Sequence, residues 1–392
     1  MKGATLVVDL AALARNFVRL RGFLPGAELV PVLKGDAYGL GAAEACKALV
    51  GVGARRVWVE TLDEASSLRA RLEAASFDRG SPAGPTPDGE RSPRGTEPGV
   101  RIGVLDGPPP GEAAAFTECG FEAAICDGGQ LREWMPEPGA SAGTCVLRVD
   151  TGFNRLGFRP DDDLIGDRAL MRALRPRAWL THLADGGAGR DSPRNVEQGE
   201  AIRRFEERLQ GPFPEGLPLS LGLDGAVALR GRIDAAEIRS GAALFGVEVF
   251  PELLPLEGVA RLDAPVLRVI EVPEGARVGY GSGWEARRPS RVAVLGIGYA
   301  HGVPRSLTGR GTVRFGEPDA LPAAPVVGAI SMELLACDVT LLPANETAPG
   351  TRGRLLDERY GINEMARDSG RLDTEILCAL GTCPKAYLRS SL

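Results

Sequence analysis

Hydrophobic and polar positions follow two recurring patterns along the first 245 residues. Short apolar runs, such as residues 55–60 (RRVWVE), have the character of buried strands. Each is followed by apolar residues at helical spacing, as are Leu13, Phe17 and Leu20 after residues 5–10 (TLVVDL). The other strand-like runs are residues 28–34, 100–105, 121–126, 144–150, 177–183, 217–222 and 236–241.

Strands that alternate with helices run parallel and are joined by crossover helices. About eight such units before residue 245 predict an N-terminal TIM-type (β/α)8 barrel over residues 5–245. A doubly wound open sheet is the alternative that the pattern leaves open. Residues 77–99 interrupt the rhythm with Gly, Pro, Ser and charge, and we expect a flexible surface insertion there.

The pattern changes after about residue 250. Strand-like runs now follow one another across Gly/Pro turns with little helix between them, at residues 264–272, 290–299, 311–316, 324–332 and 336–342. Consecutive strands without crossover helices predict a C-terminal, mostly-β domain, which we place at residues 246–392.

Composition narrows the class of protein. The 392 residues are 44% hydrophobic and 25% charged, with a formal net charge of −6 and no dense basic run. This argues against nucleic acid or an anionic membrane as a partner. Asp9 interrupts the N-terminal apolar stretch and no run of about 18 apolar residues follows, so we expect a cytoplasmic protein. Seven scattered cysteines and two histidines give no metal-site spacing, so no metal is expected.

Lys34 is the first candidate for chemistry. It ends an apolar run and precedes a turn that contains Tyr38 and the glycines Gly35, Gly39 and Gly41. A lysine at the carboxyl end of a barrel strand points into the mouth, where a partly desolvated amine can act as a nucleophile. A solvated strand-end lysine is the ordinary alternative. The glycine-rich turn favours the chemical role, since it lets backbone approach a bulky ligand.

Residues 32–41 (VLKGDAYGLG) resemble the pyridoxal-phosphate (PLP) lysine motif of alanine racemases. The resemblance continues in chain order, which makes it far more specific than a single match. The matching segments are residues 149–158 (VDTGFNRLGF), 181–185 (THLAD), 237–246 (EIRSGAALFG), 278–281 (VGYG), 296–305 (GIGYAHGVPR) and 326–333 (VVGAISME).

The resemblance implies a PLP-dependent racemase that interconverts L- and D-alanine or a related amino acid. Proton removal on one face of Cα and return on the other requires two bases. By resemblance these are Lys34, which also holds PLP, and Tyr280 of the partner subunit in a homodimer. Two alternatives stay open: another PLP reaction, such as decarboxylation or aldol cleavage, and a non-catalytic PLP-binding or regulatory protein.

The same resemblance assigns the remaining site residues. It implies cofactor contacts from Tyr38, His182, Arg239, Gly225, Gly241 and Ala242, substrate contacts from Arg155 and Met332, and gate positions at Tyr299, Arg305 and Glu333. Arg239 would disfavour protonation of the cofactor's ring nitrogen, because two adjacent positive groups are costly. Related decarboxylases carry a carboxylate there, so Arg239 favours racemisation.

Several positions depart from the family pattern. The phosphate-binding Asn-Ser pair is replaced by Asp224 and Gly225, and a C-terminal tyrosine is absent near Thr382. Arg148 stands where many members carry a carbamylated lysine, so another group must orient Arg155. At the gate, Ala329 and Glu333 stand where the family has arginine and aspartate. Another gate position that is acidic in the family falls near Gly187 in this chain. We therefore expect a wider gate and a substrate other than, or broader than, alanine.

Overall fold

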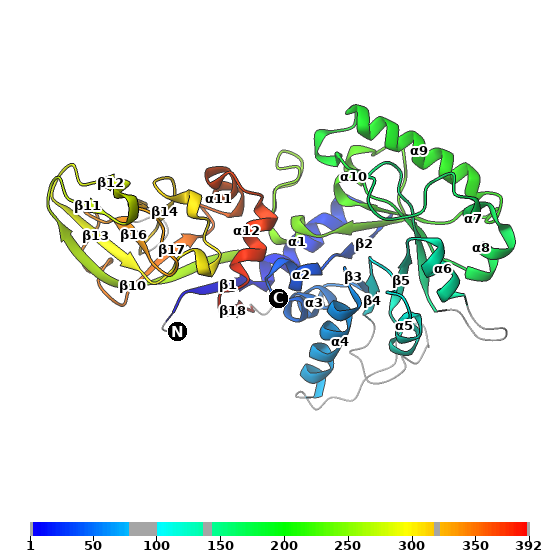
Figure 1. Cartoon of the computed structure of the whole chain (residues 1–392), viewed down its shortest axis with the longest axis horizontal. Coiled ribbons are helices and arrows are strands. Elements are labelled where there is room, and N and C mark those ends of the chain that lie inside the picture. Colours follow the sequence, from blue (N-terminus) through cyan, green and yellow to red (C-terminus); the bar gives the residue numbers. More distant parts are fainter. Residues whose placement is uncertain (1–2, 78–99, 136–142, 317–321, 390–392) are drawn as a thin grey trace.

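The computed structural model describes residues 3–77, 100–135, 143–316 and 322–389, which form two lobes (Figure 1). The insertion predicted at residues 77–99 lies outside the described residues, apart from Phe77 at the end of α4. The strand-rich lobe contains most of the chain after residue 259, and the boundary near residue 245 stays a prediction.

The N-terminal lobe is built on eight parallel strands in the order β2-β9-β8-β7-β6-β5-β4-β3. They are β2 (Glu28–Pro31), β3 (Arg56–Val59), β4 (Arg101–Val104), β5 (Glu122–Ile125), β6 (Cys145–Arg148), β7 (Trp179–Leu180), β8 (Leu219–Gly222) and β9 (Glu237–Ser240). A parallel bridge between Val32 and Trp58 brings the two ends of this sheet together. The Leu33 N–H also donates to the Trp58 carbonyl at 2.7 Å. The predicted barrel is confirmed, and the open sheet is not the topology observed.

Helices surround the barrel (Figure 1). They are α1 (Leu10–Phe23), α2 (Lys34–Tyr38), α3 (Ala42–Gly51), α4 (Leu62–Phe77), α5 (Ala113–Cys119), α6 (Gly128–Trp134), α7 (Asp163–Gly166), α8 (Arg168–Leu174), α9 (Pro193–Leu209) and α10 (Leu223–Ala228). Helix α1 begins where the Asp9 carboxylate caps the backbone N–H groups of Ala11 and Ala12 at 2.9 Å. Its predicted apolar face, which includes Leu13 and Phe17, is buried.

The second lobe is organised around the long strand β10 (Ala260–Val272). Its main sheet has the order β16-β13-β10-β1-β18, and β17 also pairs with β10. The remaining elements are β1 (Thr5–Asp9), β11 (Arg277–Val278), β12 (Trp284–Glu285), β13 (Ser290–Leu295), β14 (Thr312–Val313), β15 (Ala324–Pro325), β16 (Leu335–Asp338), β17 (Arg352–Leu356), α11 (Ile362–Ser369), α12 (Asp373–Leu380) and β18 (Lys385–Leu388). The predicted strand-rich second domain is therefore confirmed in its character.

Strand β1 corrects one sequence-based expectation. The pattern grouped residues 5–10 with the barrel units, but β1 runs antiparallel to β10, with Thr5 opposite Asp263, and parallel to β18. Four of its five residues are buried. Apolar patterning shows that such a strand is buried, but it cannot show which sheet the strand joins.

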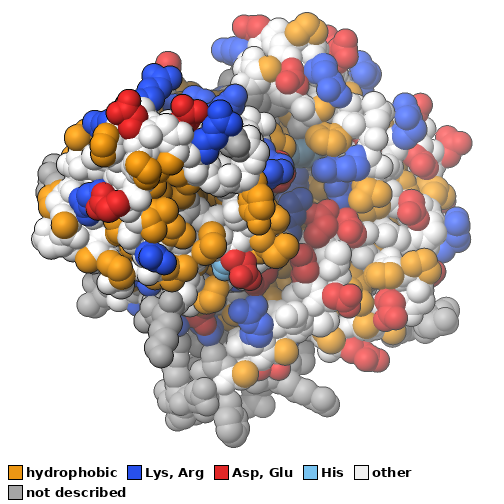
Figure 2. All heavy atoms as spheres, turned by 60° about the vertical axis from the view of Figure 1, so that its left-hand side comes forward, with side chains coloured by type: hydrophobic (Ala, Val, Ile, Leu, Met, Phe, Trp, Pro, Cys, Tyr) orange, Lys and Arg blue, Asp and Glu red, His pale blue; other side chains and the backbone are white. Residues whose placement is uncertain are grey.

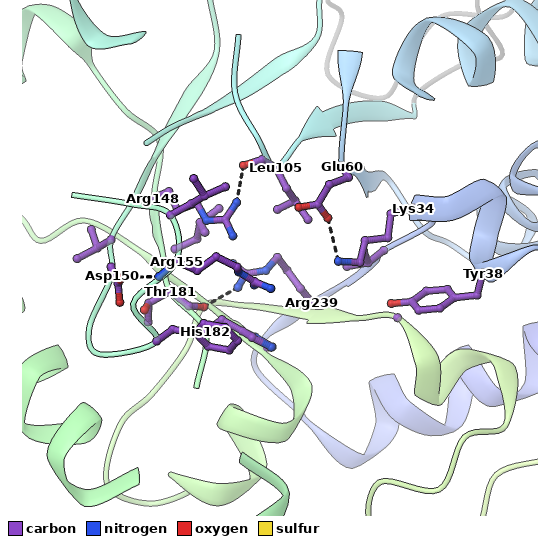
Figure 3. Close-up of a pocket in the computed structure, with 17 residues that line it drawn as sticks. Lys34, Tyr38, Glu60, Leu105, Arg148, Asp150, Arg155, Thr181, His182 and Arg239 are labelled. Atoms are coloured by element: carbon purple, nitrogen blue, oxygen red, sulfur yellow. Dashed lines mark hydrogen bonds and ion pairs between the residues drawn. The ribbon is translucent and has the colours of Figure 1, made fainter. Parts of the chain in front are cut away.

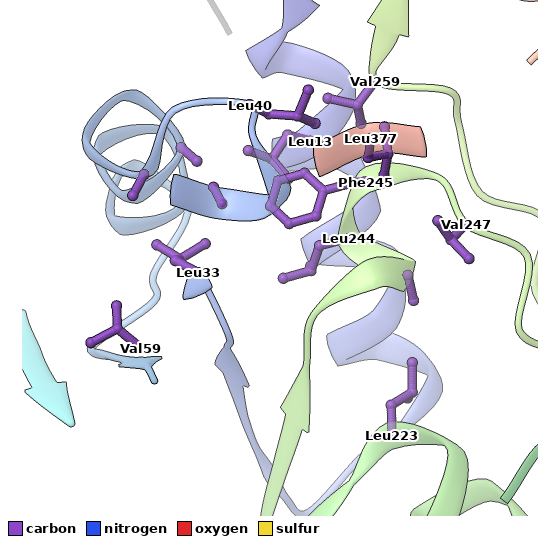
Figure 4. Packing of buried hydrophobic residues seen from close by; sticks show 14 of the residues in the cluster. Leu13, Leu33, Leu40, Val59, Leu223, Leu244, Phe245, Val247, Val259 and Leu377 are labelled. Atoms are coloured by element: carbon purple, nitrogen blue, oxygen red, sulfur yellow. The ribbon is translucent and has the colours of Figure 1, made fainter. Parts of the chain in front are cut away.

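The hydrophobic core is continuous between the lobes. Figure 4 shows Leu13 of α1, Phe245 and Leu377 of α12 in one cluster beside the barrel strands. A separate cluster, including Val30, Trp58 and Val146, fills the barrel interior. This packing gives the strand ends that carry the site a rigid support.

Candidate active site

A pocket opens at the carboxyl ends of the barrel strands (Figure 3), where chemistry is found in barrels of this type. Six residues proposed from the sequence line it together: Lys34, Tyr38, Arg155, His182, Arg239 and Gly241. They come from chain segments more than 200 residues apart, so closure of the barrel assembles them.

Lys34 precedes a backbone turn of unusual hand. Asp36, Ala37 and Tyr38 have φ values of 52°, 57° and 55°, so α2 winds left-handed after its first residue. Each such non-glycine residue costs of order 1–2 kcal/mol. The turn is held by the Ala37 N–H on the Leu33 carbonyl and the Ala42 N–H on the Asp36 carboxylate, both at 2.8 Å. Backbone strain kept in this way is typical of functional sites.

Tyr38 fits closely against the chain after β9. A side chain at position 241 would collide with the Tyr38 hydroxyl, so Gly241 is required for this contact. The Tyr38 ring packs against Phe245 with centroids 5.5 Å apart. Burial raises the pKa of Tyr38 to about 12, against a hydrogen bond with the backbone of Ala242. Tyr38, Gly241 and Ala242 thus lie together, and their contact with the cofactor stays a prediction.

Arg239 is a buried cation in the pocket wall. Its Nη1 donates to the Ser220 carbonyl at 3.1 Å and to the Ser220 hydroxyl at 2.9 Å, and its Nη2 donates to the Thr181 carbonyl at 2.5 Å. Burial lowers the pKa of Arg239 to about 10, with Glu237 opposing the shift. Among the residues described, none accepts a hydrogen bond from Nε, so that donor is available to a ligand.

His182 lies beside Arg239 at the end of β7. Burial lowers its pKa to about 4, and the nearby Arg239, Arg155 and Lys34 add to the effect while Asp224 opposes it. The imidazole is therefore neutral near pH 7. Its ring faces Phe153 with centroids 5.7 Å apart, and a side chain at Gly222 would collide with it. The result is a flat, uncharged surface in the pocket.

Arg155 projects from a loop that Asp150 organises. The Asp150 carboxylate accepts the backbone N–H groups of Gly152, Asn154 and Arg155 at 2.9–3.0 Å. The Arg155 guanidinium lies over the Phe153 ring, 4.2 Å from its centroid. No carboxylate among the described residues pairs with it, so Arg155 can receive an anion from outside the protein.

Two carboxylates in this region were missed from the sequence. Glu60 follows β3 and pairs with Lys34, with 2.8 Å between Oε2 and Nζ. Asp106 follows β4, and the nearby Glu60 carboxylate adds to burial in raising the pKa of Asp106. Arg148 donates to the Leu105 carbonyl at 2.7 Å and lies 4.0 Å from Asp106. The available signal was their position, since each carboxylate directly follows an apolar strand and therefore lies at the mouth.

Other residues proposed for the cofactor lie apart from the pocket lining. The Gly225 N–H donates to the Asp224 carboxylate at 2.9 Å, and Gly225 packs against Leu183 and Leu221. The exposed Thr382 donates its hydroxyl to the Ala379 carbonyl at 2.9 Å. Cofactor contact by Gly225 stays a prediction. The Thr382 hydroxyl is bonded to a carbonyl near the end of α12.

The residues proposed from the second domain gather on an exposed surface. We call Tyr280, Tyr299, Met332 and Leu334, with the backbone that carries them, the loop face. Their exposed fractions are 73%, 44%, 57% and 43%. The backbone N–H groups of Tyr299 and Ala300 donate to the carbonyls of Ser331 and Met332 at 3.1 and 2.9 Å. Figure 2 shows hydrophobic side chains grouped on the near, strand-rich lobe.

The loop face is separate from the pocket of its own chain. None of its residues lines that pocket. Figure 1 places β11 and β12, which flank Tyr280, at the end of the molecule away from the barrel. The proposed gate residues Arg305 and Glu333 are also exposed. In the described parts of the chain, no helix is long and apolar enough to cross a membrane, and no cluster of His, Cys, Asp or Glu could hold a metal ion.

The lysine-bearing pocket lies at the mouth of a (β/α)8 barrel joined to a strand-rich second domain, a two-domain architecture that the chain shares with solved racemases. Residues 8–249 match the family model "Alanine racemase, N-terminal domain", and residues 259–387 match "Alanine racemase, C-terminal domain". The chain belongs to the alanine racemase family.

Individual relatives agree over the full length. The alanine racemase of Acidiphilium cryptum is 35% identical over 394 residues, covering 100% of both chains. That of Methylobacterium nodulans is 34% identical and covers 97% of this chain and 94% of its own. The crystal structure of alanine racemase from Bartonella henselae with covalently bound pyridoxal phosphate is 26% identical, with a TM-score of 0.82 over 99% of this chain and 100% of that one.

Proposed function

We propose that this protein is a PLP-dependent racemase that interconverts the L and D forms of alanine or a related amino acid. The observation that carries the proposal is the convergence of Lys34, Tyr38, His182 and Arg239 on one pocket. A nucleophilic amine, a buried cation, a neutral ring and a buried phenol are all present there. The relatives named alanine racemase support the choice of substrate class.

The residues of the pocket fit PLP. Lys34 would hold the cofactor, His182 would lie against its ring, and Arg239 would present its unpartnered Nε to the ring nitrogen. Tyr38 with the backbone of Gly241 and Ala242 would receive the phosphate. The contact between Tyr38 and Gly241, which no other residue at position 241 would permit, supports a cradle built for a ligand group at this end.

When bound, PLP supplies an electron sink for the charge that develops at the substrate Cα. Arg239 stays positive in a buried place, which disfavours a second positive charge beside it. Arg155, without a carboxylate partner, would hold the substrate carboxylate through its planar fork. The Lys34 nitrogen would remove or return the Cα proton on one face.

The second face of Cα needs a second base. Tyr280 is the candidate, and it is 73% exposed on the loop face. We propose a homodimer in which the loop face of one subunit closes the pocket of the other. Tyr280 of the partner subunit would then serve the face opposite Lys34, and Met332 and the gate residues Tyr299, Arg305 and Glu333 would flank the opening.

Two finer features belong to the same proposal. Ala329 is small and half-buried beside Gly279, which leaves room at the opening for side chains larger than methyl. We therefore expect a substrate range wider than alanine. We also expect the enzyme to act in the cytoplasm, because all seven cysteines are free thiols.

The test is α-proton exchange in D2O, followed by NMR, with PLP-loaded protein, each enantiomer of an amino-acid panel and Lys34→Ala as control. Exchange with accumulation of the opposite enantiomer, absent in Lys34→Ala, is the expected result. Loss of CO2 or cleavage of Cα–Cβ would instead identify another PLP reaction. A protein that remains colourless with PLP would indicate a degenerate relative.

A further inference from the structure

We propose that Glu60, which lies beside Asp106, is a positioning residue that holds the Lys34 nitrogen through an ion pair. The inference rests on the proposed function, because it concerns the lysine that would hold PLP. It adds a residue that the sequence did not suggest.

Four strand ends carry one row of charged side chains, of which Figure 3 shows Lys34, Glu60 and Arg148. Glu60 Oε2 lies 2.8 Å from Lys34 Nζ, and Asp106 lies close enough to Glu60 for the two carboxylates to shift each other's pKa. Arg148 completes the row, 4.0 Å from Asp106. The Lys34 side chain is 38% exposed and that of Glu60 is 28% exposed, so the pair is partly shielded from water. A carboxylate at this distance restricts where the lysine nitrogen can lie.

The two carboxylates have unequal roles. Neighbouring carboxylates ionise together only at a cost, so the pKa of one of them is raised. Burial, and then the adjacent Glu60 carboxylate, raise the pKa of Asp106 to about 6. Burial works against ionisation of Glu60 too, but contacts with Lys34 and Asp106 lower its pKa. Asp106 therefore takes up a proton before Glu60 does as the pH falls, and Glu60 presents a negative charge to Lys34.

A third carboxylate, that of Glu64, fixes the backbone around Lys34 and Glu60 without touching the lysine nitrogen. Glu64 of α4 accepts the Gly35 N–H at 2.7 Å with one oxygen and the Glu60 N–H at 2.8 Å with the other. It thus joins the chain after Lys34 to the end of β3. Because it acts only on backbone, Glu64 offers a comparison that separates geometry from charge.

The charged and titratable groups around the Lys34–Glu60 pair come from six elements or their ends. They are Tyr38 in α2, Glu64 in α4, Asp106 after β4, Arg148 in β6, His182 after β7 and Cys378 in α12. Among them, Glu60 alone places an ionised oxygen on Lys34 Nζ. Its removal should therefore change how the protonation of this nitrogen follows pH.

The test measures how fast full-length protein freed of PLP recaptures it, from the growth of cofactor absorbance between pH 6 and pH 10. Covalent capture requires the unprotonated amine. Borohydride trapping and mass spectrometry confirm Lys34 as the site. For Glu60→Gln we expect the midpoint of the rate–pH curve to move down by about one pH unit. Glu64→Gln should slow capture at every pH without moving the midpoint, and Glu200→Gln on the exposed face of α9 should change neither.

An unchanged midpoint in folded Glu60→Gln would overturn the inference. Thermal unfolding verifies folding, and Glu60→Ala replaces Glu60→Gln if the latter does not fold. Glu60→Asp, which keeps the charge, should restore most of the wild-type midpoint. If wild-type protein captures PLP and racemises while the midpoint stays fixed, only the role of Glu60 fails. If wild-type protein does not capture PLP, the proposed function fails as well.

Discussion

The barrel pocket and the loop face differ in how their side chains are held. In the pocket, Arg239 is tied to three oxygen atoms and Lys34 to a carboxylate. On the loop face the backbone is bonded across loops, but Tyr280 and Met332 extend into solvent. A preorganised pocket suits cofactor binding, whereas an exposed apolar surface suits contact with another molecule. In the proposed homodimer, each region would form half of a site.

The largest effect on racemisation should come from mixing two variants that each lack one of the two proposed bases. Lys34→Ala and Tyr280→Phe homodimers should each lose nearly all racemisation. After mixing and reassociation, random pairing gives heterodimers with one intact site, so we expect about a quarter of wild-type activity. NMR exchange assays before and after mixing measure the recovery.

The control for this experiment is the double variant Lys34→Ala/Tyr280→Phe. Mixed with either single variant, it cannot form an intact site and should recover nothing. If the main mixture shows no activity above background although its subunits are proven to exchange, Tyr280 does not act across the interface.

The next largest difference between the barrel and the loop face should be in how much a substitution lowers the free energy of unfolding. Arg56 is buried in the barrel and pairs with Glu122 at 3.1 Å and Glu237 at 3.4 Å. Arg56→Met would leave two buried carboxylates to Arg177 alone, so we expect the free energy of unfolding to fall by about 3 kcal/mol. Tyr280→Phe on the exposed loop face should change it by less than about 0.5 kcal/mol. Urea denaturation measures both, and equal losses would contradict this contrast.

Sequence reasoning was strongest where the pattern is local and periodic. Alternation of strands and helices predicted the barrel, although it left an open sheet as an alternative, and ordered motifs located Lys34, His182 and Arg239. The sheet that β1 joins could not be predicted, because apolar spacing indicates that a strand is buried but not which strand it pairs with. Patterning also could not show that Tyr280 lies exposed far from its own pocket, since that depends on how β11 and β12 are placed.

Glu60 and Asp106 were missed for a different reason. Acidic residues after a strand are usually solvated turn residues, so neither stood out singly. The carboxyl ends of parallel strands meet at one mouth, however. Comparing the residues that follow each strand as one set would have placed Glu60 and Asp106 beside Lys34.

Acid should weaken the pocket through His182. Its folded-state pKa of about 4 lies below the ordinary value of 6.5, so the unfolded chain binds more protons between these values. Stability therefore falls as pH drops from 6.5 toward 4, by roughly 3 kcal/mol from this group. His182→Gln should flatten that part of the curve of unfolding free energy against pH. Urea denaturation at several pH values measures the slope, and a slope that stays the same in His182→Gln would contradict this role.

The smallest expected effect concerns the opening of the site. Ala329 lies in the segment that carries Met332, and its backbone N packs against Gly279 beside Tyr280. Ala329→Arg should narrow the opening and lower kcat/KM for large amino acids about tenfold relative to alanine, since a pocket discriminates side-chain size by only a few kcal/mol. Ala344→Arg, at an exposed position outside the loop face, is the matched control. Equal turnover ratios in the two variants would show that substrate breadth is set inside the barrel pocket and that the loop face contributes only Tyr280 and closure.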